Sequence, residues 1–332
     1  MTAEEIEALF SSFNNLRIMV IGDVMIDAYM WGKVNRISPE APVPIVAVDR
    51  LENRLGGAAN VSLNVQALGA IPLTFAVIGD DEKGNLLRQL FKEQSLSDKG
   101  IIQSPDRKTT VKTRVLSGGN QILRVDEEIE MDLGKNDEEA LIAAINSALE
   151  NDQIDAIIFE DYDKGLITEG VINAVREKAS ALNIPLMVDP KKKNFNNYRN
   201  ASLFKPNLKE IREGMKVDIY QNNIGDIEGA VGTLVRDKGH NLVLVTLSEL
   251  GIYIGGSGGS DRILAHYRDI TDVSGAGDTV ISVATLCLVR DTAPKFIASL
   301  SNLAGGIVCE KVGVIPIDRD QLLREAKALL AE

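Results

Sequence analysis

The stretch "DVSGAGDT", Asp272–Thr279, stands directly before "VISVATLCLV", an apolar run that is long enough for a buried helix. A helix that begins here leaves the backbone N–H groups of Gly275, Ala276 and Gly277 without intrahelical acceptors, and its dipole adds partial positive charge. These residues therefore predict an anion hole, with Asp278 beside it in the first turn. The alternative for Asp278 is an ordinary acidic cap, which the same dipole favours.

Short apolar strand-like runs alternate with helical patterns along the chain, which predicts an α/β fold with a mainly parallel sheet covered by helices. The expected core strands are 17–22, 73–78, 155–160, 184–189, 202–207 and 241–246. The expected helices are 57–69, 83–95, 136–150, 168–182, 222–238, 276–289, 293–311 and 318–331. Because no repeat or long linker interrupts this pattern, we expect one domain over residues 1–332.

Two segments, approximately 28–52 and 107–128, predict a small β lid inserted into this core. The run "PVPIVAVDRLE" (42–52) is strand-like, and "TVKTRVLSGGNQILRVDEE" (110–128) predicts a hairpin with a Gly-Gly-Asn turn. We expect Arg114 to pair with Arg124 across a three-residue loop. One face of the hairpin then carries Val111, Thr113, Val115, Leu123 and Val125. The other, basic face carries Lys112, Arg114 and Arg124.

The composition excludes several classes of function. The 332 residues are 45% hydrophobic and 25% charged, as in ordinary globular proteins, and the net charge of -12 argues against nucleic acid or a membrane surface as partner. The two cysteines, Cys287 and Cys309, lie in apolar helical patterns and predict buried thiols. With two histidines in the chain, a Ser–His nucleophile pair is not expected. An N-terminus unlike a signal peptide, with no membrane-length apolar run, predicts a cytoplasmic protein.

Polar side chains follow several predicted strands, at the edge where open α/β sheets bind ligands. The segment "IGDVMID" (21–27) supplies Asp23 and Asp27, for which turn capping is the alternative. The segments "EDYDKG" (160–165) and "VDPKKKNF" (188–195) supply Asp161, Asp163, Lys164, Asp189 and Lys191. A solvated lysine loop is the alternative for the second of these segments.

Two further segments begin predicted helices. In "LGGAANVSLNVQALGA" (55–70), Gly56 and Gly57 allow close backbone approach, and Asn60 offers a donor and an acceptor to hydroxyl groups. In "KPNLKEI" (205–211), Asn207 and Glu210 stand three apart. That spacing suits hydrated magnesium, and equally a capping box in which the two side chains bond each other's backbone amides. Neither a dinucleotide-binding nor a P-loop signature is present.

An anion hole, a neighbouring carboxylate and residues suited to hydroxyl groups and magnesium together indicate phosphoryl transfer to an alcohol. The basic face of the hairpin, with Arg36 and Lys191 nearby, predicts a site for a phosphate already on the sugar. We expect strong discrimination for that phosphate, because buried cations left unpaired are costly. Asp23, Asn60 and Asp161 are the candidates for binding ring hydroxyls.

The chain resembles the PfkB, or ribokinase-like, carbohydrate kinases over essentially its whole length. "GGAANVSLNVQALGA" is similar to the first motif of that family, "DVSGAGDT" to the second and "NLKE" to its internal N-x-x-E. The resemblance implies a ribokinase-like three-layer sandwich with a β lid that often forms dimers. It also implies ATP as donor, Mg²⁺, and Asp278 as the base. Asn207 and Glu210 would organise the metal and phosphates, and ATP would lie near Thr246, Ser248, Gly251 and Asn302.

Three longer segments resemble, within this family, the kinases of D-glycero-β-D-manno-heptose 7-phosphate. They are "GDVMIDAYMWGKVNRISPEAPVPIV", "VKTRVLSGGNQILRVDEE" and "VDPKKKNFNNYRNASLFKPNLKE". The reaction implied yields the 1,7-bisphosphate for ADP-heptose and lipopolysaccharide core. No H-x-G-H-type nucleotidyltransferase motif is present, so we expect the kinase alone. Ser274 stands where Thr is common, "EDYDKG" where "DYGKG" is usual, and Leu247 where a cation often precedes the Ser.

Two other functions stay open at this point. One is a kinase of the same fold that acts on fructose, ribose or a keto-sugar. The other is a regulator that binds a sugar phosphate or a nucleotide without turnover. The intact Asp278 and its anion-hole sequence favour an enzyme.

Overall fold

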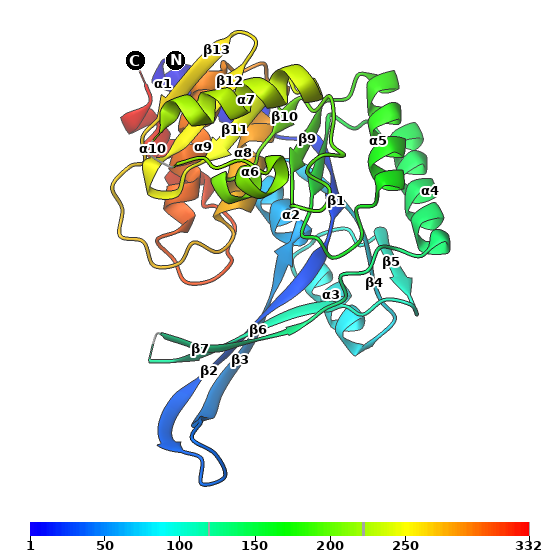
Figure 1. The fold of residues 1–332 in the computed structure, drawn as a ribbon, viewed down its shortest axis with the longest axis vertical. Helices are drawn as coiled ribbons and strands as arrows, with labels where there is room; N and C mark the ends of the chain where they lie inside the picture. Colours follow the sequence, from blue (N-terminus) through cyan, green and yellow to red (C-terminus); the bar gives the residue numbers. More distant parts are fainter. Residues whose placement is uncertain (119, 221–222, 332) are drawn as a thin grey trace.

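The computed structural model of the chain describes residues 1–118, 120–220 and 223–331. A large sheet forms the body of the molecule and a smaller sheet projects from it (Figure 1). The large sheet has the strand order β13-β12-β11-β10-β9-β8-β1-β4-β5. Pairing is parallel from β5 to β11 and antiparallel at β12 and β13. The prediction of a mainly parallel sheet is confirmed.

The strands of the large sheet are β1 (Arg17–Gly22), β4 (Ile71–Gly79), β5 (Gly100–Ser104), β8 (Ala156–Glu160), β9 (Leu186–Asp189), β10 (Leu203–Phe204), β11 (Leu242–Thr246), β12 (Ile252–Gly256) and β13 (Gly259–Ile263). Residues 18–21 of β1 are completely buried. A continuous apolar run of this kind is typical of a central parallel strand that is covered on both faces. β5, β12 and β13 were not predicted. The predicted strand 202–207 is too long: β10 ends at Phe204, before Pro206, which lacks the N–H that a ladder needs.

Helices pack on both sides of this sheet (Figure 1). They are α1 (Ala3–Ser12), α2 (Ala58–Ala67), α3 (Glu82–Glu93), α4 (Lys135–Asn151), α5 (Glu169–Leu182), α6 (Leu208–Met215), α7 (Ile224–Lys238), α8 (Ala276–Val289), α9 (Pro294–Val308) and α10 (Arg319–Leu329), with a short 3-10 turn at Ser248–Leu250. The predicted helix 276–289 is confirmed to the residue, and the other seven are confirmed within a few residues; 222, the first residue of one prediction, lies outside the described residues. None of the described helices is both long enough and apolar enough to span a membrane.

The smaller sheet is the predicted lid. It contains β2 (Val24–Ile37), β3 (Pro44–Gly57), β6 (Thr110–Ser117) and β7 (Asn120–Glu127), in the order β3-β2-β6-β7. β2 follows β1 directly along the chain, and β3 leads directly into α2. The base of the lid is therefore joined to the carboxyl end of β1 in the large sheet. Both cysteines are free and buried, as predicted.

The register of the hairpin β6–β7 is confirmed, since Arg114 pairs with Arg124. The predicted three-residue turn is wrong. Asn120 already belongs to β7 and pairs with Ser117, while residue 119 lies outside the described residues. A bulge between Val115 and Leu116 absorbs the extra residue. Because the bulge lies on the turn side of Val115 and Leu123, residues 111–115 and 123–125 keep their expected faces, while Leu116 is opposite Gln121.

Candidate active site

α8 begins at Ala276, as "DVSGAGDT" predicts, but the N–H of Ala276, which that prediction placed in the anion hole, is engaged by the protein. Gly275 is the N-cap and has a φ of 80°, which favours glycine. A Cβ at this position would lie 2.9 Å from the Nδ2 of Asn60. The N–H of Ala276 donates to the carbonyl of Val273 at 3.3 Å, and Thr279 makes the first intrahelical bond. Within the described residues, the N–H groups of Gly277 and Asp278 have no backbone acceptor.

The Asp278 side chain is 4% exposed and is held at both oxygens. Asn60 donates from Nδ2 to Oδ2 at 2.7 Å, and the hydroxyl of Tyr162 donates to Oδ1 at 2.9 Å. Burial raises the pKa of Asp278 to about 6, although the bonds from Asn60 and Tyr162 lower it. At neutral pH the group is thus a fixed carboxylate that is able to accept a proton.

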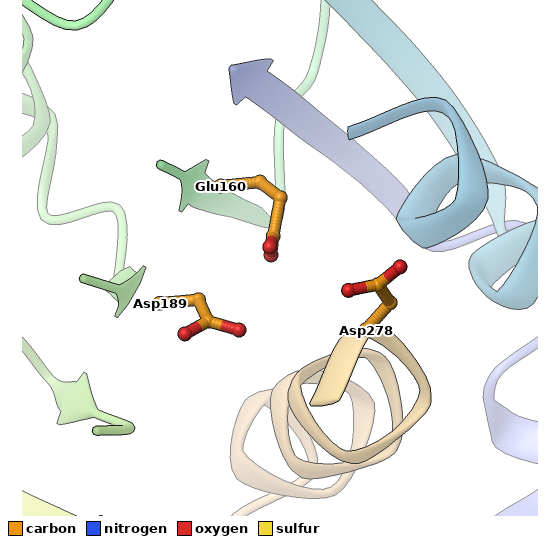
Figure 2. A group of neighbouring side chains, drawn as sticks. All are labelled: Glu160, Asp189 and Asp278. Carbon is orange, nitrogen blue, oxygen red and sulfur yellow. The ribbon is translucent and has the colours of Figure 1, made fainter. Parts of the chain in front are cut away.

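Two more carboxyl groups converge on Asp278 from neighbouring strand ends (Figure 2). Glu160 ends β8 and Asp189 ends β9, and oxygens of all three groups lie within 4.8 Å of one another. Burial, with the charges of Asp189 and Asp278, raises the pKa of Glu160 well above its usual range. Lys205 contacts Asp189 at 2.7 Å, and both are buried. Burial lowers the pKa of Lys205, but Asp189 outweighs it and the net direction is upward.

Asp23 and Asp161 organise the loop that carries Tyr162. Asp23 accepts the backbone N–H groups of Tyr162, Lys164 and Leu166 at 3.0 to 3.3 Å. Burial raises the pKa of Asp23 to about 6. Asp161 accepts the hydroxyl of the buried Tyr198 at 2.7 Å. Asp23 therefore caps a turn, which is the alternative weighed for it above. The side-chain oxygens of Asp23 and of Asp161 accept hydrogen bonds from the protein itself.

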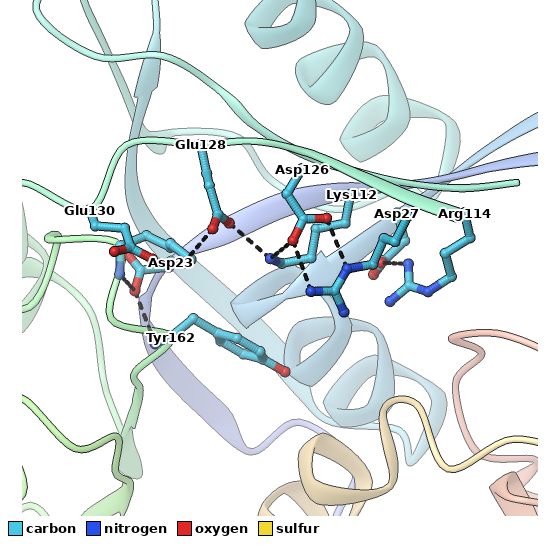
Figure 3. A network of polar contacts seen from close by, with 10 residues as sticks. Asp23, Asp27, Lys112, Arg114, Asp126, Glu128, Glu130 and Tyr162 are labelled. Carbon is cyan, nitrogen blue, oxygen red and sulfur yellow. Dashed lines mark hydrogen bonds and ion pairs between the residues drawn. The ribbon is translucent and has the colours of Figure 1, made fainter. Parts of the chain in front are cut away.

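The face of the lid nearest this site is charge-balanced rather than basic (Figure 3). Arg114 pairs with the buried Asp27, and Arg124 contacts Asp126 at 2.9 Å. Lys112 lies 2.8 Å from Glu128.

Lys164 belongs to the same network, with its ammonium group 2.8 Å from Glu128 and from Glu130. The predicted cations therefore share one face, but each already has a carboxylate partner. The expectation that a missing substrate phosphate would leave them unpaired is wrong, because acidic residues of the lid alternate with them.

Gly56 and Gly57 make room for protein groups. A Cβ at Gly56 would meet Oδ2 of Asp27, and a Cβ at Gly57 would meet the carbonyl oxygen of Asp23. Gly57 has a φ of 61° and caps α2, whose first N–H donates to that same carbonyl at 3.0 Å. The two glycines therefore let β3 turn sharply into α2, which places Asn60 against Asp278.

Asn207 and Glu210 form a complete capping box at the start of α6. Oε2 of Glu210 accepts the N–H of Asn207 at 2.8 Å, and the Asn207 side chain accepts the N–H of Glu210 at 2.9 Å. Lys191 donates to the remaining Oε1 at 2.7 Å and lies over the ring of Tyr162 at 5.2 Å. Burial lowers the pKa of Lys191, but the negative charges of Asp189 and Glu210 have a larger effect, so the pKa is raised overall.

The remaining predicted residues fall into two places. Thr246 ends β11 and forms a bridge with Asn207, while Ser248 and Gly251 lie in the turn that follows. Asn302 donates from α9 to the carbonyl of Leu264 at 2.8 Å. Arg36, in contrast, is exposed in the distal part of β2, opposite Ile45. The lid extends away from the body there (Figure 1), so Arg36 is not brought to Asp278.

Three residues at this edge were missed in the sequence. Glu160 and Lys205 each interrupt an apolar strand run, in "AIIFE" and "SLFK". A charge at such a position is a usable signal, since charged residues are rarely buried without a partner. Tyr162 carries no such signal. Its role depends on the loop conformation that Asp23 imposes.

Known proteins resemble this chain in sequence and in fold. A family model described as "pfkB family carbohydrate kinase" matches residues 15–320. "Bifunctional protein HldE" of Caulobacter sp. (strain K31) is 38% identical over 94% of this chain and 63% of its own length. The protein of that name from Campylobacter jejuni is 38% identical over 94% of this chain and 65% of its own length. The chain thus spans a little under two thirds of these curated relatives.

Solved structures show the same fold. Phosphofructokinase-2 from Escherichia coli in complex with potassium has a TM-score of 0.77 at 17% identity, covering 96% of this chain and all of that one. Arabidopsis thaliana ribokinase complexed with ribose and ATP has a TM-score of 0.69 at 14% identity, covering 94% and 99%. The predicted ribokinase-like α/β fold is therefore confirmed.

Proposed function

Because the chain belongs to the pfkB family of carbohydrate kinases, we propose that it transfers the γ-phosphoryl group of ATP to the C1 hydroxyl of D-glycero-β-D-manno-heptose 7-phosphate. The product is the 1,7-bisphosphate, on the route to ADP-heptose and lipopolysaccharide core. The three segments that resemble heptose 7-phosphate kinases support this substrate, as does the similarity to bifunctional HldE proteins. We propose that residues 1–332 form one kinase domain that includes the lid. The cytoplasmic location of the protein stays a prediction.

The observation that carries this proposal is the position of Asp278 beside the free N–H groups at the start of α8. The C1 hydroxyl lies against the Asp278 carboxylate, and its proton passes to that group as the oxygen attacks phosphorus. The N–H groups of Gly277 and Asp278 receive the charge of the moving phosphoryl group. Asn60 and Tyr162 hold the carboxylate in this orientation.

ATP lies along the C-terminal half of the sheet edge in this proposal, near Thr246, Ser248, Gly251 and Asn302. The bridge between Thr246 and Asn207 brings this region next to the capping box. Because the side-chain oxygens of Asn207 and Glu210 already accept hydrogen bonds, these residues fit a hydrated Mg²⁺ held through water rather than a directly bound ion. When bound, Mg²⁺ neutralises charge on the phosphates.

The 7-phosphate lies at the lid, where Lys112, Arg114 and Arg124 share one face. A guanidinium has five N–H donors, so Arg114 is able to bind phosphate while it keeps Asp27 as a partner. Since each cation has a carboxylate partner in the lid, a sugar without this phosphate leaves no buried cation unpaired. We therefore expect the phosphate to improve kcat/KM by about 10- to 100-fold, which corresponds to about one hydrogen bond to a charged group.

The lid also provides a surface for a homodimer. Leu51, Met30, Val115 and Leu123 form one row across its four strands, and Leu51 and Leu123 are 65% and 55% exposed. Exposed apolar side chains that gather on one face mark interaction sites. We propose that this row packs against the lid of a second copy.

An ATP-consumption screen tests the proposed substrate. The full chain is assayed with heptose 7-phosphate, fructose, ribose and the phosphates of the last two, each with and without Mg²⁺. We expect the highest kcat/KM with heptose 7-phosphate and a product phosphorylated at C1. Preference for an unphosphorylated sugar would assign another kinase of this family. Binding of a sugar phosphate without turnover of any sugar would assign a regulator.

A further inference from the structure

Residues 312–314, which follow α9, join the lid to the body of the molecule. The Nη1 group of Arg54, in β3, donates to the carbonyl oxygens of Val312 and Val314 at 3.1 and 3.3 Å. The hydroxyl oxygen of Tyr29, in β2, accepts the N–H of Val314 at 3.0 Å. Two side chains of the lid therefore hold three backbone groups of this segment.

Gly313 shows how closely the segment fits against the lid. Its φ is 77°, a conformation that favours glycine. A Cβ at this position would lie 2.7 Å from Nη1 of Arg54 and 2.8 Å from the hydroxyl oxygen of Tyr29. The Arg54 guanidinium in turn lies over the Tyr29 ring, 4.9 Å from its centroid. The contact is therefore a close fit that leaves no room for a side chain at position 313.

The same segment contacts the turn that begins α8. Oδ2 of Asp272 accepts the N–H of Gly313 at 2.9 Å, and Oδ1 accepts the N–H of Ser274 at 2.9 Å. A Cβ at Gly275, the N-cap of α8, would lie 3.4 Å from Cγ1 of Val314. Asp272 and Val314 therefore connect the lid to the turn whose helix presents the proposed anion donors.

The lid side of this connection lies beside the proposed phosphate site. Arg54 is opposite Asp27 in the pairing of β2 with β3, and Asp27 pairs with Arg114 (Figure 3). The Arg114 guanidinium lies 5.5 Å from the centroid of the Tyr29 ring. Arg114, the proposed phosphate ligand, thus contacts the same aromatic ring as Arg54.

We propose that Arg54 is a positioning residue for the phosphoryl transfer. Together with Tyr29, it holds residues 312–314 against the turn 272–275 and so fixes the start of α8 relative to the lid. N–H groups that stabilise a moving charge are effective only when they are already in place before the reaction. The effect on turnover rests on the proposed function, whereas the effect on the backbone at the start of α8 does not.

Hydrogen exchange in the full chain without ligands tests the effect on the backbone. Arg54→Met removes both hydrogen bonds to residues 312–314 and keeps an unbranched apolar side chain. We expect amide exchange in peptides that span 272–280, followed by mass spectrometry, to become about tenfold or more faster, because bonds from a charged donor are lost. Tyr29→Phe is the milder variant, since it removes one hydroxyl and keeps the ring, and it should act in the same direction.

Arg50→Met is the matched control. Arg50 also lies in β3 with its guanidinium over an aromatic ring, at 5.0 Å from the centroid of Trp31, and it contacts Glu52 at 3.3 Å. Because these two partners belong to the lid, exchange at 272–280 should equal that of the wild type. If Arg54→Met and Tyr29→Phe also exchange like the wild type there, while urea unfolding shows both to be folded, Arg54 does not position α8.

Steady-state kinetics with the sugar phosphate tests the effect on turnover. In Arg54→Met we expect kcat to fall about tenfold and the KM for the sugar phosphate to change less than about threefold, because the anion donors act mainly in the transition state. Arg54→Lys keeps a cationic donor and should lose less. A raised KM with unchanged kcat would instead assign Arg54 to substrate binding and overturn the proposal. Faster exchange in Arg54→Met, in a chain whose wild type turns over no sugar phosphate, would contradict the proposed function alone.

Discussion

At the scale of single residues, the candidate active site consists of charged groups that are held in place by buried partners. Asp278 receives one bond at each oxygen, and Lys205 holds Asp189. In a poorly solvated place such contacts cost little reorganisation during the reaction. Each group therefore has a separate and measurable role.

Substitution of the proposed base should separate turnover from binding. In Asp278→Asn we expect kcat to fall about 10²- to 10⁴-fold, because the proton of the hydroxyl loses its acceptor. The dissociation constant of the sugar phosphate, measured by calorimetry, should change by less than about threefold, because asparagine keeps the shape of the side chain. Nearly wild-type turnover would show that Asp278 is an ordinary helix cap.

The buried ion pair should contribute strongly to folding. Lys205 is 3% exposed, and Lys205→Met leaves Asp189 buried without its partner. We expect the free energy of unfolding in urea to fall by about 3 to 5 kcal/mol. Lys209→Met is the matched control, since the Lys209 side chain is 79% exposed and its ammonium group lies 3.9 Å from a carboxylate oxygen of Glu213. The control should lose about 0.5 kcal/mol or less, and equal losses would contradict this account.

His240 should make stability depend on pH. It is 1% exposed, accepts the N–H of Ala201, and stacks on Phe204. Burial lowers its pKa to about 3, whereas the unfolded chain has a value near 6.5. Between these values the unfolded state binds more protons, so stability falls as the pH falls below 6.5. From pH 7 to pH 5 this contribution is about 2 kcal/mol.

The variant His240→Asn isolates that contribution, because asparagine keeps an acceptor for Ala201 and does not titrate. Urea unfolding at pH 7 and pH 5 should show a loss about 2 kcal/mol smaller in the variant than in the wild type. The same loss in both proteins would mean that the pKa of His240 is the same in the folded and in the unfolded chain.

At the scale of elements, the start of α8 is the decisive feature, and its two glycines have different roles. Gly275 needs its positive φ, whereas Gly277 is helical and a Cβ there would make only ordinary contacts. We expect Gly275→Ala to lower the free energy of unfolding by about 1 to 3 kcal/mol.

Gly277→Ala should be as stable as the wild type or slightly more so, because alanine favours the helix. Its methyl group would still lie beside Lys205 and Asp189, at the edge where the phosphoryl group passes. We therefore expect kcat to fall about tenfold or more while folding is intact, as measured by urea unfolding and the ATP assay. Equal stability of the two alanine variants would contradict the distinct roles.

Elements were predictable where the local pattern is strong. The helix 276–289 follows from one long apolar run after Gly275, and the faces of residues 111–115 and 123–125 follow from alternation. β12 and β13 were missed because "IYIGG" and "GSDRI" are short and rich in glycine or charge. β12 is a strand because it pairs with β11, and β13 is a strand because it pairs with β12; both pairings are tertiary contacts.

At the scale of the whole molecule, the two faces of the lid differ in chemistry. One face carries the paired charges around Asp27 and Arg114, and the other carries the exposed apolar row. A sheet with two such faces is suited to bind a polar ligand on one side and another protein on the other.

A charge in the apolar row should therefore separate the proposed dimer. Leu123→Glu places a carboxylate on the exposed face, and we expect a mass of one chain by light scattering, against two for the wild type. Lys135→Glu, a charge change at an exposed position on α4, is the control and should remain dimeric. A wild type that is monomeric at micromolar concentration would rule out this interface.

The sequence by itself determined the alternation of strands and helices, the start of α8, the faces of the hairpin up to its bulge and the type of chemistry. These depend on local periodicity and on glycine, which neighbours in the chain suffice to specify. Only the tertiary structure decided which charges meet. It paired the lid cations with lid carboxylates, turned Asp23 and Asp161 toward a loop, and brought Glu160, Asp189 and Asp278 together from three separate elements. Coulomb interactions depend on distance in space, and that distance arises only when parallel strands place their ends along one edge.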